Sequence, residues 1–528
     1  MQTLTRWAHI TFSAGMTITT LSCFAGDLQN FVGKPDFLPV SANAPIANNV
    51  DVPIPSNPTD PEQLTLRDAV LLALHKNPNL NMSINNRKLQ RYDLLTAEQA
   101  FRPQVTLAST AGYTDNTSTN SPESNSTQRQ LTVGPTVNWT VPLGTQFTAN
   151  WGYSPSETTN SSPSTTHNTN WEISIMQPLL QNFGTDVNDV ALDNAVDQQK
   201  IDTMQLQQTV MTTIITTVSD YYALAQAEQN EQITKQSLKD KEKTLTVRKE
   251  EYKAGRIPGT DVTQAKLDIT TQRQAAQQAH LATETAQAQL LTVDLGLPAD
   301  TRFHIVPTLT IEKLKTPSVA QSVAEAALKN LDLQIAEITY KQQQRNMLTS
   351  ENAQRWTLDL TASRSRQRLD QTLQSLGIPS TSSSITDSSS VDLNLSIPLD
   401  RVSIDQQELS AATGMNNAEI SLDNARRTLT SNITTSIDSL HNLWIQLKVS
   451  EENLNLSTAN TKAAQIKFKY GKLDAFTLSQ QEEQLQTAQQ NVINSQVAYL
   501  KQILTYQQQM GTLLNDWNIH FTAPDNDT

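Results

Sequence analysis

Apolar and polar side chains alternate with a period of two in several short stretches of this chain. In residues 131–141 and 147–153, valine, tryptophan and phenylalanine alternate with threonine and asparagine, and Pro142-Leu143-Gly144-Thr145 separates the two runs. A period of two predicts strands with one apolar face, and a Gly-containing segment between two such runs predicts a hairpin. Further alternating runs surround Val105, Ile173, Leu358 and Leu393. The pattern therefore predicts about four strands in the first half of the chain and two in the second.

The segments between the alternating runs are polar. Residues 116–127, 157–170 and 375–390 are rich in Ser, Thr and Asn and are predicted as loops in water. The runs themselves, at ~9–11 residues, are long enough to cross a bilayer as tilted strands with one apolar face. A soluble β-sandwich with solvated faces is the alternative for these strands.

Two long stretches of the chain read as continuous helices. Residues 186–254 contain neither Pro nor Gly, and residues 403–470 contain one Gly, Gly414, and no Pro. At 1.5 Å per residue each stretch would extend ~100 Å. Return helices are predicted over 260–295 and 475–514. Their apolar seams are narrow and Gln, Thr, Ser and Asn fill the other faces, which indicates coiled coils exposed to water. A tube that continues the strands would explain this, and a solid coiled-coil stalk is the alternative.

The order of these elements occurs twice. A helix is predicted from Leu64 to Pro78, and residues in and just after it return 253 positions later. Pro178 corresponds to Pro398 at an offset of 220, and Gly255 corresponds to Gly471 at 216. The matched set pairs Val70 with Val323, Ala73 with Ala326, Lys76 with Lys329, Asn77 with Asn330 and Leu80 with Leu333. The first half is longer by 33 residues (253 − 220), which contain the predicted hairpin. We infer an internal duplication, with a first repeat over 64–316 and a second over 317–516.

The N-terminus has the character of a targeting segment. Arg6 is followed by a mostly apolar stretch to Ala25, so residues 1–25 are predicted as a signal peptide. Lipid attachment at Cys23 is the alternative to cleavage after Ala25. A Pro-rich extended segment over 26–63 follows, and residues 517–528 form a C-terminal tail. No later segment has the ~18 apolar residues of a membrane helix, so an exported protein of this kind would enter a membrane only as closed strands.

Composition and charge narrow the function. Gly is 15 of 528 residues and charged residues are 17%, which argues against a loop-rich α/β enzyme. The net charge of −13 opposes nucleic-acid binding. The seven His are scattered, there is one Cys, and nucleotide-binding and nucleophile motifs are missing from the sequence. We therefore expect no enzyme, no cofactor and no metal site.

In these features the chain resembles the TolC-like outer-membrane efflux protein family over about residues 64–514. The resemblance rests on the duplicated order of helix, strands, long helix, turn and return helix, and on Gln177-Pro178-Leu179-Leu180 with Ile397-Pro398-Leu399. It also rests on the phrase that runs from Tyr252 to Val262. The resemblance implies a mainly α fold with transmembrane β: a homotrimer whose strands form one β-barrel, continued by a periplasmic α-helical barrel. It further implies a periplasmic adaptor and an inner-membrane pump as partners, and outer-membrane lipid around the barrel.

The resemblance places gating and adaptor docking at the two helical tips. The residues concerned are Tyr252, Gly255, Arg256, Asp261, Phe468, Gly471, Lys472, Thr477 and Gln480. Asp261 stands where the family has an acidic tip residue, whereas Thr477 and Gln480 replace aspartates that line the entrance in some members. Leu473 replaces a cation, and the adjacent Lys472 is expected as the partner of Asp261. As an alternative, Asp261 is only a cap or a first-turn acid of its helix.

The sequence thus predicts a bacterial outer-membrane channel that passively conducts substrates outward from a tripartite efflux or type I secretion system. An exported structural or adhesive stalk without a pore is the alternative. The additional hairpin either joins the barrel, for 18 strands in a trimer instead of 12, or lies outside it as an extracellular flap. Trp139 and Trp151 favour the first arrangement because tryptophan concentrates at lipid interfaces.

Overall fold

The computed structural model describes residues 63–116, 126–159, 163–298, 301, 303–305, 311, 313–315, 317–375, 378–519 and 521. The predicted signal peptide with Cys23, almost all of the Pro-rich segment and most of the C-terminal tail lie outside these residues.

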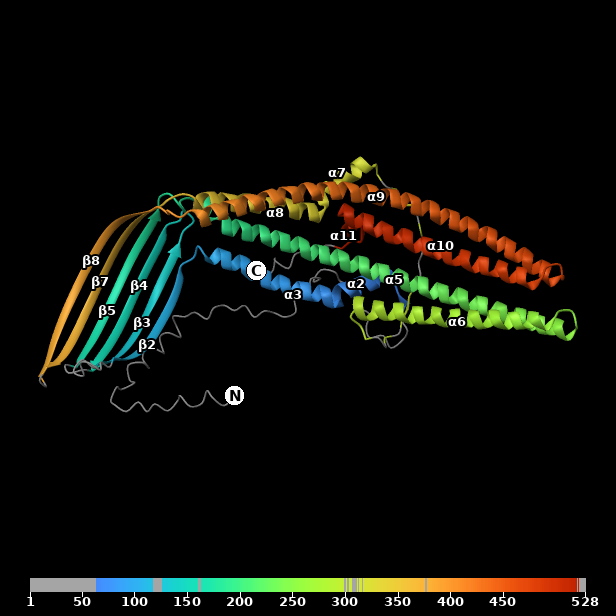
Figure 1. Ribbon diagram of the computed structural model, residues 1–528, viewed down its shortest axis with the longest axis horizontal. Coiled ribbons are helices and arrows are strands. Elements are labelled where there is room, and N and C mark those ends of the chain that lie inside the picture. The colour runs from blue at the N-terminus through green and yellow to red at the C-terminus, as the bar shows by residue number, and fades with distance from the viewer. Residues whose placement is uncertain are drawn as a thin grey trace. The chain divides into compact units, whose positions relative to one another are not determined.

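One antiparallel sheet contains the six long strands, in the order β2-β3-β4-β5-β7-β8 (Figure 1). The strands are β2 (Gln104–Asn116), β3 (Ser126–Thr140), β4 (Gln146–Thr159), β5 (Ser164–Pro178), β7 (Thr357–Ser375) and β8 (Ile378–Ser396). The additional hairpin is β3–β4, and it lies between β2 and β5 as part of the sheet, so the flap alternative is wrong. Gly144 in its turn has φ +94°, a conformation that favours glycine.

The sheet has one apolar and one polar face. Paired residues share a face, so the register places Val137, Ala149 and Ile173 on the same side. The large apolar residues of this face are Val105, Leu107, Tyr113, Leu131, Val133, Val137, Trp139, Phe147, Trp151, Tyr153, Trp171, Ile173, Ile175, Leu358, Leu360, Ile385, Val391, Leu393 and Leu395. On the polar face Ser, Thr, Asn and Gln predominate, and its charged residues within the described strands are the carboxylates Glu172, Asp359 and Asp392.

The strands are longer than the alternating runs predicted. Much of segments 157–170 and 375–390, expected as loops, is strand: β5 begins at Ser164 and β8 at Ile378. These strand ends carry few apolar residues, so their side chains show no alternation. They are ordered instead by continuous backbone pairing, as between Ser384 and Leu369, and Ser and Thr tolerate an extended backbone well.

A long hairpin of two helices follows β5 in the chain, and a second one follows β8. In the first repeat α5 (Val190–Lys253) pairs with α6 (Gly259–Gln289), which a π-helical turn, η3 (Leu290–Asp294), extends. In the second, α9 (Val402–Lys469) pairs with α10 (Ala475–Met510). Short helices α4 (Thr185–Asn188) and α11 (Leu513–Asp516) complete these regions. The predicted rods and return helices are therefore present. Among the described residues no helix is both long and apolar enough to cross a bilayer.

Two further helices were not recognised in the sequence. After α2 (Leu66–Lys76) the chain continues as α3 (Pro78–Gln99), and after α7 (Val319–Lys329) as α8 (Leu331–Ala353). A single capping asparagine separates the helices of each pair. Asn77 Oδ1 accepts from the backbone N–H of Leu80 at 3.1 Å, and Asn330 Oδ1 accepts from that of Leu333 at 3.0 Å. The equivalent residues Asn77 and Asn330 thus cap equivalent helices, as a duplication predicts.

Each repeat has its own core where these short helices meet the long ones. In the second repeat the buried cluster includes Leu333, Ile433, Tyr499 and Tyr506. In the first repeat the large apolar side chains that are almost completely buried include Leu80, Ile214, Tyr221, Leu224, Leu290, Leu291 and Leu295. The Tyr221 hydroxyl donates to the backbone oxygen of Leu64 at 3.0 Å, beside β1 (Gln63–Leu64), which pairs with β6 (His304–Ile305). Broad apolar burial is confined to this middle region, and the rest of each hairpin holds together by a narrow seam.

Candidate functional site: the helical tips

The two tips are built from matching turns. Gly255 follows α5 and Gly471 follows α9, and both have φ +68°. Arg256 N–H donates to the Glu251 oxygen at 2.9 Å, and Lys472 N–H donates to the Lys467 oxygen at 2.8 Å. A Cβ added at either glycine would meet nothing within 4 Å, so the left-handed backbone conformation, not lack of space, calls for glycine.

The return helices begin differently in the two repeats. Asp474 caps α10: its Oδ1 accepts from the Thr477 N–H at 2.9 Å and its Oδ2 from the Thr477 hydroxyl at 2.7 Å. The backbone and side-chain hydrogen bonds from Thr477 lower the pKa of Asp474. In α6 the capping position is Pro258, which has no side-chain acceptor. Thr477 thus stabilises a helix start, and Gln480 lies exposed one turn later.

Asp261 forms an ion pair within its own hairpin. Its Oδ2 lies 3.0 Å from Arg248 Nη1, which α5 presents across the seam. The expected pairing with Lys472 is wrong: Lys472 is exposed in the turn of the other hairpin, and its side chain has no ion-pair partner among the described residues. Asp261 is not the cap of α6 either, but it does lie in the first turn, where a carboxylate also favours the helix dipole.

A groove lies between the two hairpins at their tips, and we call it the tip groove. Among the predicted residues, Asp261, Phe468 and Gly471 line it, whereas the others do not, namely Tyr252, Gly255, Arg256, Lys472, Thr477 and Gln480. Its other lining residues are Lys241, Thr244, Arg248, Glu251, Ile257, Gln264, Ala265, Asp268, Leu473, Asp474, Ala475, Phe476, Ser479 and Glu482. Carboxylates outnumber cations in this set, so the tip groove is acidic although Thr477 and Gln480 replace aspartates. Sequence reasoning missed most of these acids because Glu251, Asp268 and Glu482 lie in polar helix faces, where an acidic residue is usually just exposed to solvent.

Polar contacts join the two hairpins, and the sequence did not reveal them. Lys241 of α5 donates to Glu483 Oε1 of α10 at 2.8 Å, and the Lys241 side chain is only 9% exposed. Farther from the tip, Gln226 Nε2 of α5 donates to Asn494 Oδ1 of α10 at 2.6 Å. Burial raises the pKa of the neighbouring Glu482. Lys241 was the one residue in the sequence that could have indicated this contact, because it lies at a position of α5 that faces another helix. Periodicity alone does not identify such a position.

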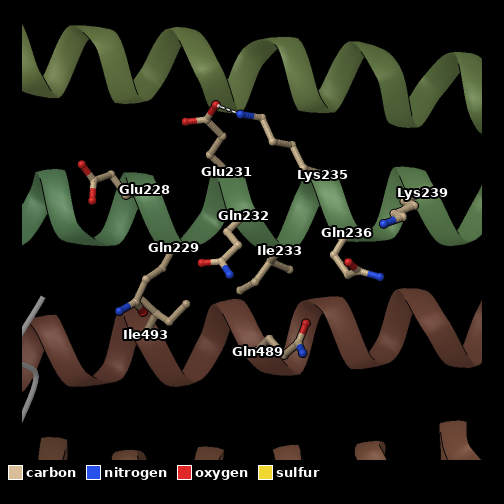
Figure 2. A pocket seen from close by; sticks show the side chains of 10 residues that line it. All are labelled: Glu228, Gln229, Glu231, Gln232, Ile233, Lys235, Gln236, Lys239, Gln489 and Ile493. Atoms are coloured by element: carbon tan, nitrogen blue, oxygen red, sulfur yellow. Dashed lines mark ion pairs between the residues drawn. The ribbon is translucent and has the colours of Figure 1, made fainter. Parts of the chain in front are cut away.

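A second groove follows α5 and α10 away from the tips (Figure 2). Glu231 is its most connected side chain: it pairs with Lys235 at 2.5 Å and with His280 Nδ1 of α6 at 2.9 Å. Burial acts to raise the pKa of Glu231, but hydrogen bonds from Lys235, Thr283 and His280 outweigh it and leave the pKa lowered. Gln489 and Ile493 of α10 form the opposite wall, as Figure 2 shows. The groove is polar, as the water-exposed rods predict.

Metal-ligand geometry is missing from the described ranges: no three His, Cys, Asp or Glu side chains there are grouped so that they could hold an ion.

Comparison with known proteins identifies the family. The model of the family described as "Outer membrane efflux protein" matches residues 146–294 and 322–512, one segment in each repeat. A search of curated protein sequences finds no match.

Solved structures share the fold. The Campylobacter jejuni CmeC outer membrane channel is 14% identical, with 85% of this chain and 86% of that chain covered and a TM-score of 0.64. The outer membrane protein VceC of Vibrio cholerae is 14% identical, with coverages of 84% and 96% and a TM-score of 0.61. The open state of the Neisseria gonorrhoeae MtrE channel is 16% identical, with coverages of 85% and 89% and a TM-score of 0.58.

The family match extends over more than half of the chain and includes both repeats. The predicted fold class, outer-membrane location and channel function are therefore confirmed, and the stalk alternative is set aside. This chain belongs to the outer membrane efflux protein family, the non-enzymatic outer-membrane channels of tripartite efflux systems, whose helices extend into the periplasm.

Proposed function

We propose that three copies of this chain close into one channel. The supporting observation is the sheet: it has an apolar face, a polar face and two unpaired edge strands, β2 and β8, every residue of which is exposed. Lipid satisfies no open sheet edge, so each edge needs a partner strand. Pairing β2 of one copy with β8 of the next supplies it. Three copies with six strands each would give a barrel of 18, with the apolar face toward lipid and the polar face toward the pore.

Cysteine cross-linking tests the edge pairing. Thr110→Cys on β2 would be combined in turn with Ser384→Cys, Ser388→Cys and Asp392→Cys on β8, all on the polar face. We expect one of these combinations to give covalent dimers and trimers on oxidation. Thr110→Cys combined with Ser174→Cys, on the central strand β5, is the control and should give none. Monomers from every combination would refute the arrangement.

We further propose that the exposed tip is where a periplasmic adaptor docks. Tyr252, Tyr470 and Phe476 are 53%, 72% and 71% exposed, an unusual display of aromatic rings at the ends of otherwise polar helices. Arg256 and Lys472 lie exposed in the two turns beside them. Aromatic and cationic side chains of this kind are typical of interaction surfaces. Replacement of Tyr470 and Phe476 by serine should abolish co-purification of the adaptor with the channel. The same exchange at Tyr92 of α3, also exposed, should leave it unchanged.

The tip contacts also suggest how the channel opens. Arg248–Asp261 lies within one hairpin, whereas Lys241–Glu483 connects two, so only the second contact must break when the hairpins separate. The hairpins would exchange between a joined and a separated arrangement. An adaptor that binds the separated arrangement more tightly would shift this equilibrium toward it. Substrates would then pass outward along the polar interior, driven by the inner-membrane pump.

A further inference from the structure

The arginines of the sheet all lie on its apolar face. Arg364, Arg366 and Arg368 alternate along β7, so their side chains share a face with Leu360 and with Ile173 of the adjacent strand. Arg129 of β3 is on the same face, in register with Tyr113. Within the described strands the polar face holds no arginine or lysine. The same face also carries the carboxylates Asp115, Glu157, Asp370 and Asp387, so only the basic residues are restricted to one face of the sheet.

Their position along the strands is equally specific. The ends of the strands that adjoin the helices lie on the periplasmic side, so distance from those ends measures height in the membrane. Arg364 lies seven residues from Thr357, Trp171 seven residues from Pro178, and Tyr153 seven residues from Gln146. Tryptophan and tyrosine at such a level form the aromatic girdle of a membrane barrel, where hydrocarbon gives way to headgroups. The β7 arginines therefore begin at the headgroup level of the outer leaflet and continue outward.

Two of these guanidinium groups have carboxylate partners and one does not. Arg366 makes a two-pronged contact with Asp387, with Nε at 2.6 Å and Nη2 at 3.0 Å, and Arg368 Nε lies 3.0 Å from Asp370. Arg364 has no hydrogen-bond or ion-pair partner among the described residues, and it faces Ile173 on one side and Ser389 on the other. An arginine on the lipid face costs free energy unless it reaches the interface and finds an anion there.

We propose that the β7 arginines form a binding site for the phosphate groups of anionic outer-leaflet lipid. Arg364 supplies a guanidinium group that no carboxylate binds by a hydrogen bond, and Arg366, fixed by Asp387, has donors left over. Successive guanidinium groups along the strand are spaced by ~7 Å, close enough for one phosphate to be held by two of them. Trp171, in register with Arg366, lies beside the site on the lipid side. The lipid thus anchors the channel at a fixed depth on each copy.

Thermal unfolding of the detergent-solubilised full-length protein tests this proposal. Three probes are titrated: lipid A, lipid A from which phosphatase has removed the phosphates, and inorganic phosphate. We expect lipid A alone to raise the unfolding midpoint in a saturable way. If the dephosphorylated lipid is equally effective, or if inorganic phosphate alone raises the unfolding midpoint as far as lipid A does, the site is not a lipid phosphate site and the proposal is overturned. This comparison requires no variant.

Variants then locate the site. Arg364→Gln should weaken the apparent affinity for lipid A about fivefold to tenfold. Arg364→Lys keeps the charge but loses the paired N–H donors of the guanidinium group, so its affinity for lipid A should fall less. Arg427→Gln, at an exposed arginine of α9, is the matched control and should bind as the native chain does. Native affinity in Arg364→Gln would overturn the assignment. Because lipid binding is measured on the isolated channel, the outcome is independent of whether the adaptor and gating proposals hold.

Discussion

Lys241 Nζ lies 2.8 Å from Glu483 Oε1 and joins the first helical hairpin to the second. The two residues are 242 positions apart in sequence. The lysine is almost completely buried while the glutamate is 58% exposed. Loss of the glutamate would leave the ammonium group buried without its partner, whereas loss of a surface pair costs little.

Glu483→Gln should therefore favour separated hairpins. A loss of about 1 kcal/mol of tip coupling corresponds to an open fraction that is about fivefold higher. Single-channel recording in planar bilayers measures this fraction. Glu250→Gln, which removes the exposed pair with Lys253 within α5, is the matched control and should leave the open fraction unchanged. An unaltered open fraction in Glu483→Gln would show that the hairpins are held by other contacts.

Asp261→Asn should behave differently, because the Arg248–Asp261 pair lies within one hairpin. We expect a small loss of stability, up to about 1 kcal/mol, since the aspartate is partly exposed and solvent screens the pair. The unfolding midpoint should fall slightly and single-channel conductance should match that of the native protein. Asp268→Asn, nearby on α6, provides the control for loss of a carboxylate. A large rise in conductance in Asp261→Asn would assign Asp261 to the gate after all.

The end of α6 should make stability depend on pH. Asp294 is 2% exposed, and its burial, followed by the charge of Asp220, raises the pKa of Asp294 to about 7. An unfolded aspartate titrates near 4, so between pH ~4 and ~7 the folded state binds more protons than the unfolded state. The free energy of unfolding should therefore fall as pH rises through this window and level off above it.

Asp294→Asn removes the titrating group from this site. At pH 8 the variant should be more stable than the native chain, by on the order of 2–4 kcal/mol, whereas near pH 4 the two should be similar. Thermal unfolding at pH 4, 5, 6, 7 and 8 measures both curves. Asp332→Asn, an exposed first-turn acid of α8, is the control. Parallel curves for the native chain and Asp294→Asn would refute the raised pKa of Asp294.

The two faces of the sheet should differ sharply in their tolerance of charge. Leu393 and Asn394 are neighbours on β8 that point to opposite faces, apolar and polar. Leu393→Arg should destabilise the inserted barrel by about 2–4 kcal/mol if it lies near the bilayer midplane, because the charge then meets lipid. Asn394→Arg should be tolerated, since that face meets water. The yield of folded, heat-resistant protein in liposomes compares the two, and equal yields would contradict the assignment of faces.

Local patterns in the sequence were sufficient for most of the elements and for their repetition, although α3 and α8 were missed. Alternation identified the apolar faces of β3 and β4, the lack of proline identified α5 and α9, and recurring residues such as Asn77 and Asn330 identified the duplication. Each of these signals is carried by residues close together along the chain, or by the same short pattern occurring twice. Where the apolar alternation faded, as at the outer end of β8, the strand was missed because backbone pairing, not side-chain burial, orders it.

Tertiary structure alone decided which distant side chains meet. It placed β3–β4 inside the sheet, paired Asp261 with Arg248 instead of Lys472, and brought Lys241 to Glu483. It also enclosed Asp294, which in sequence is one more acid near a helix end. The physical reason is that the pairing and burial of a polar side chain depend on the rotation and register of helices that lie far apart in the sequence. Periodicity shows which face of a helix is apolar, but not which helix that face will contact.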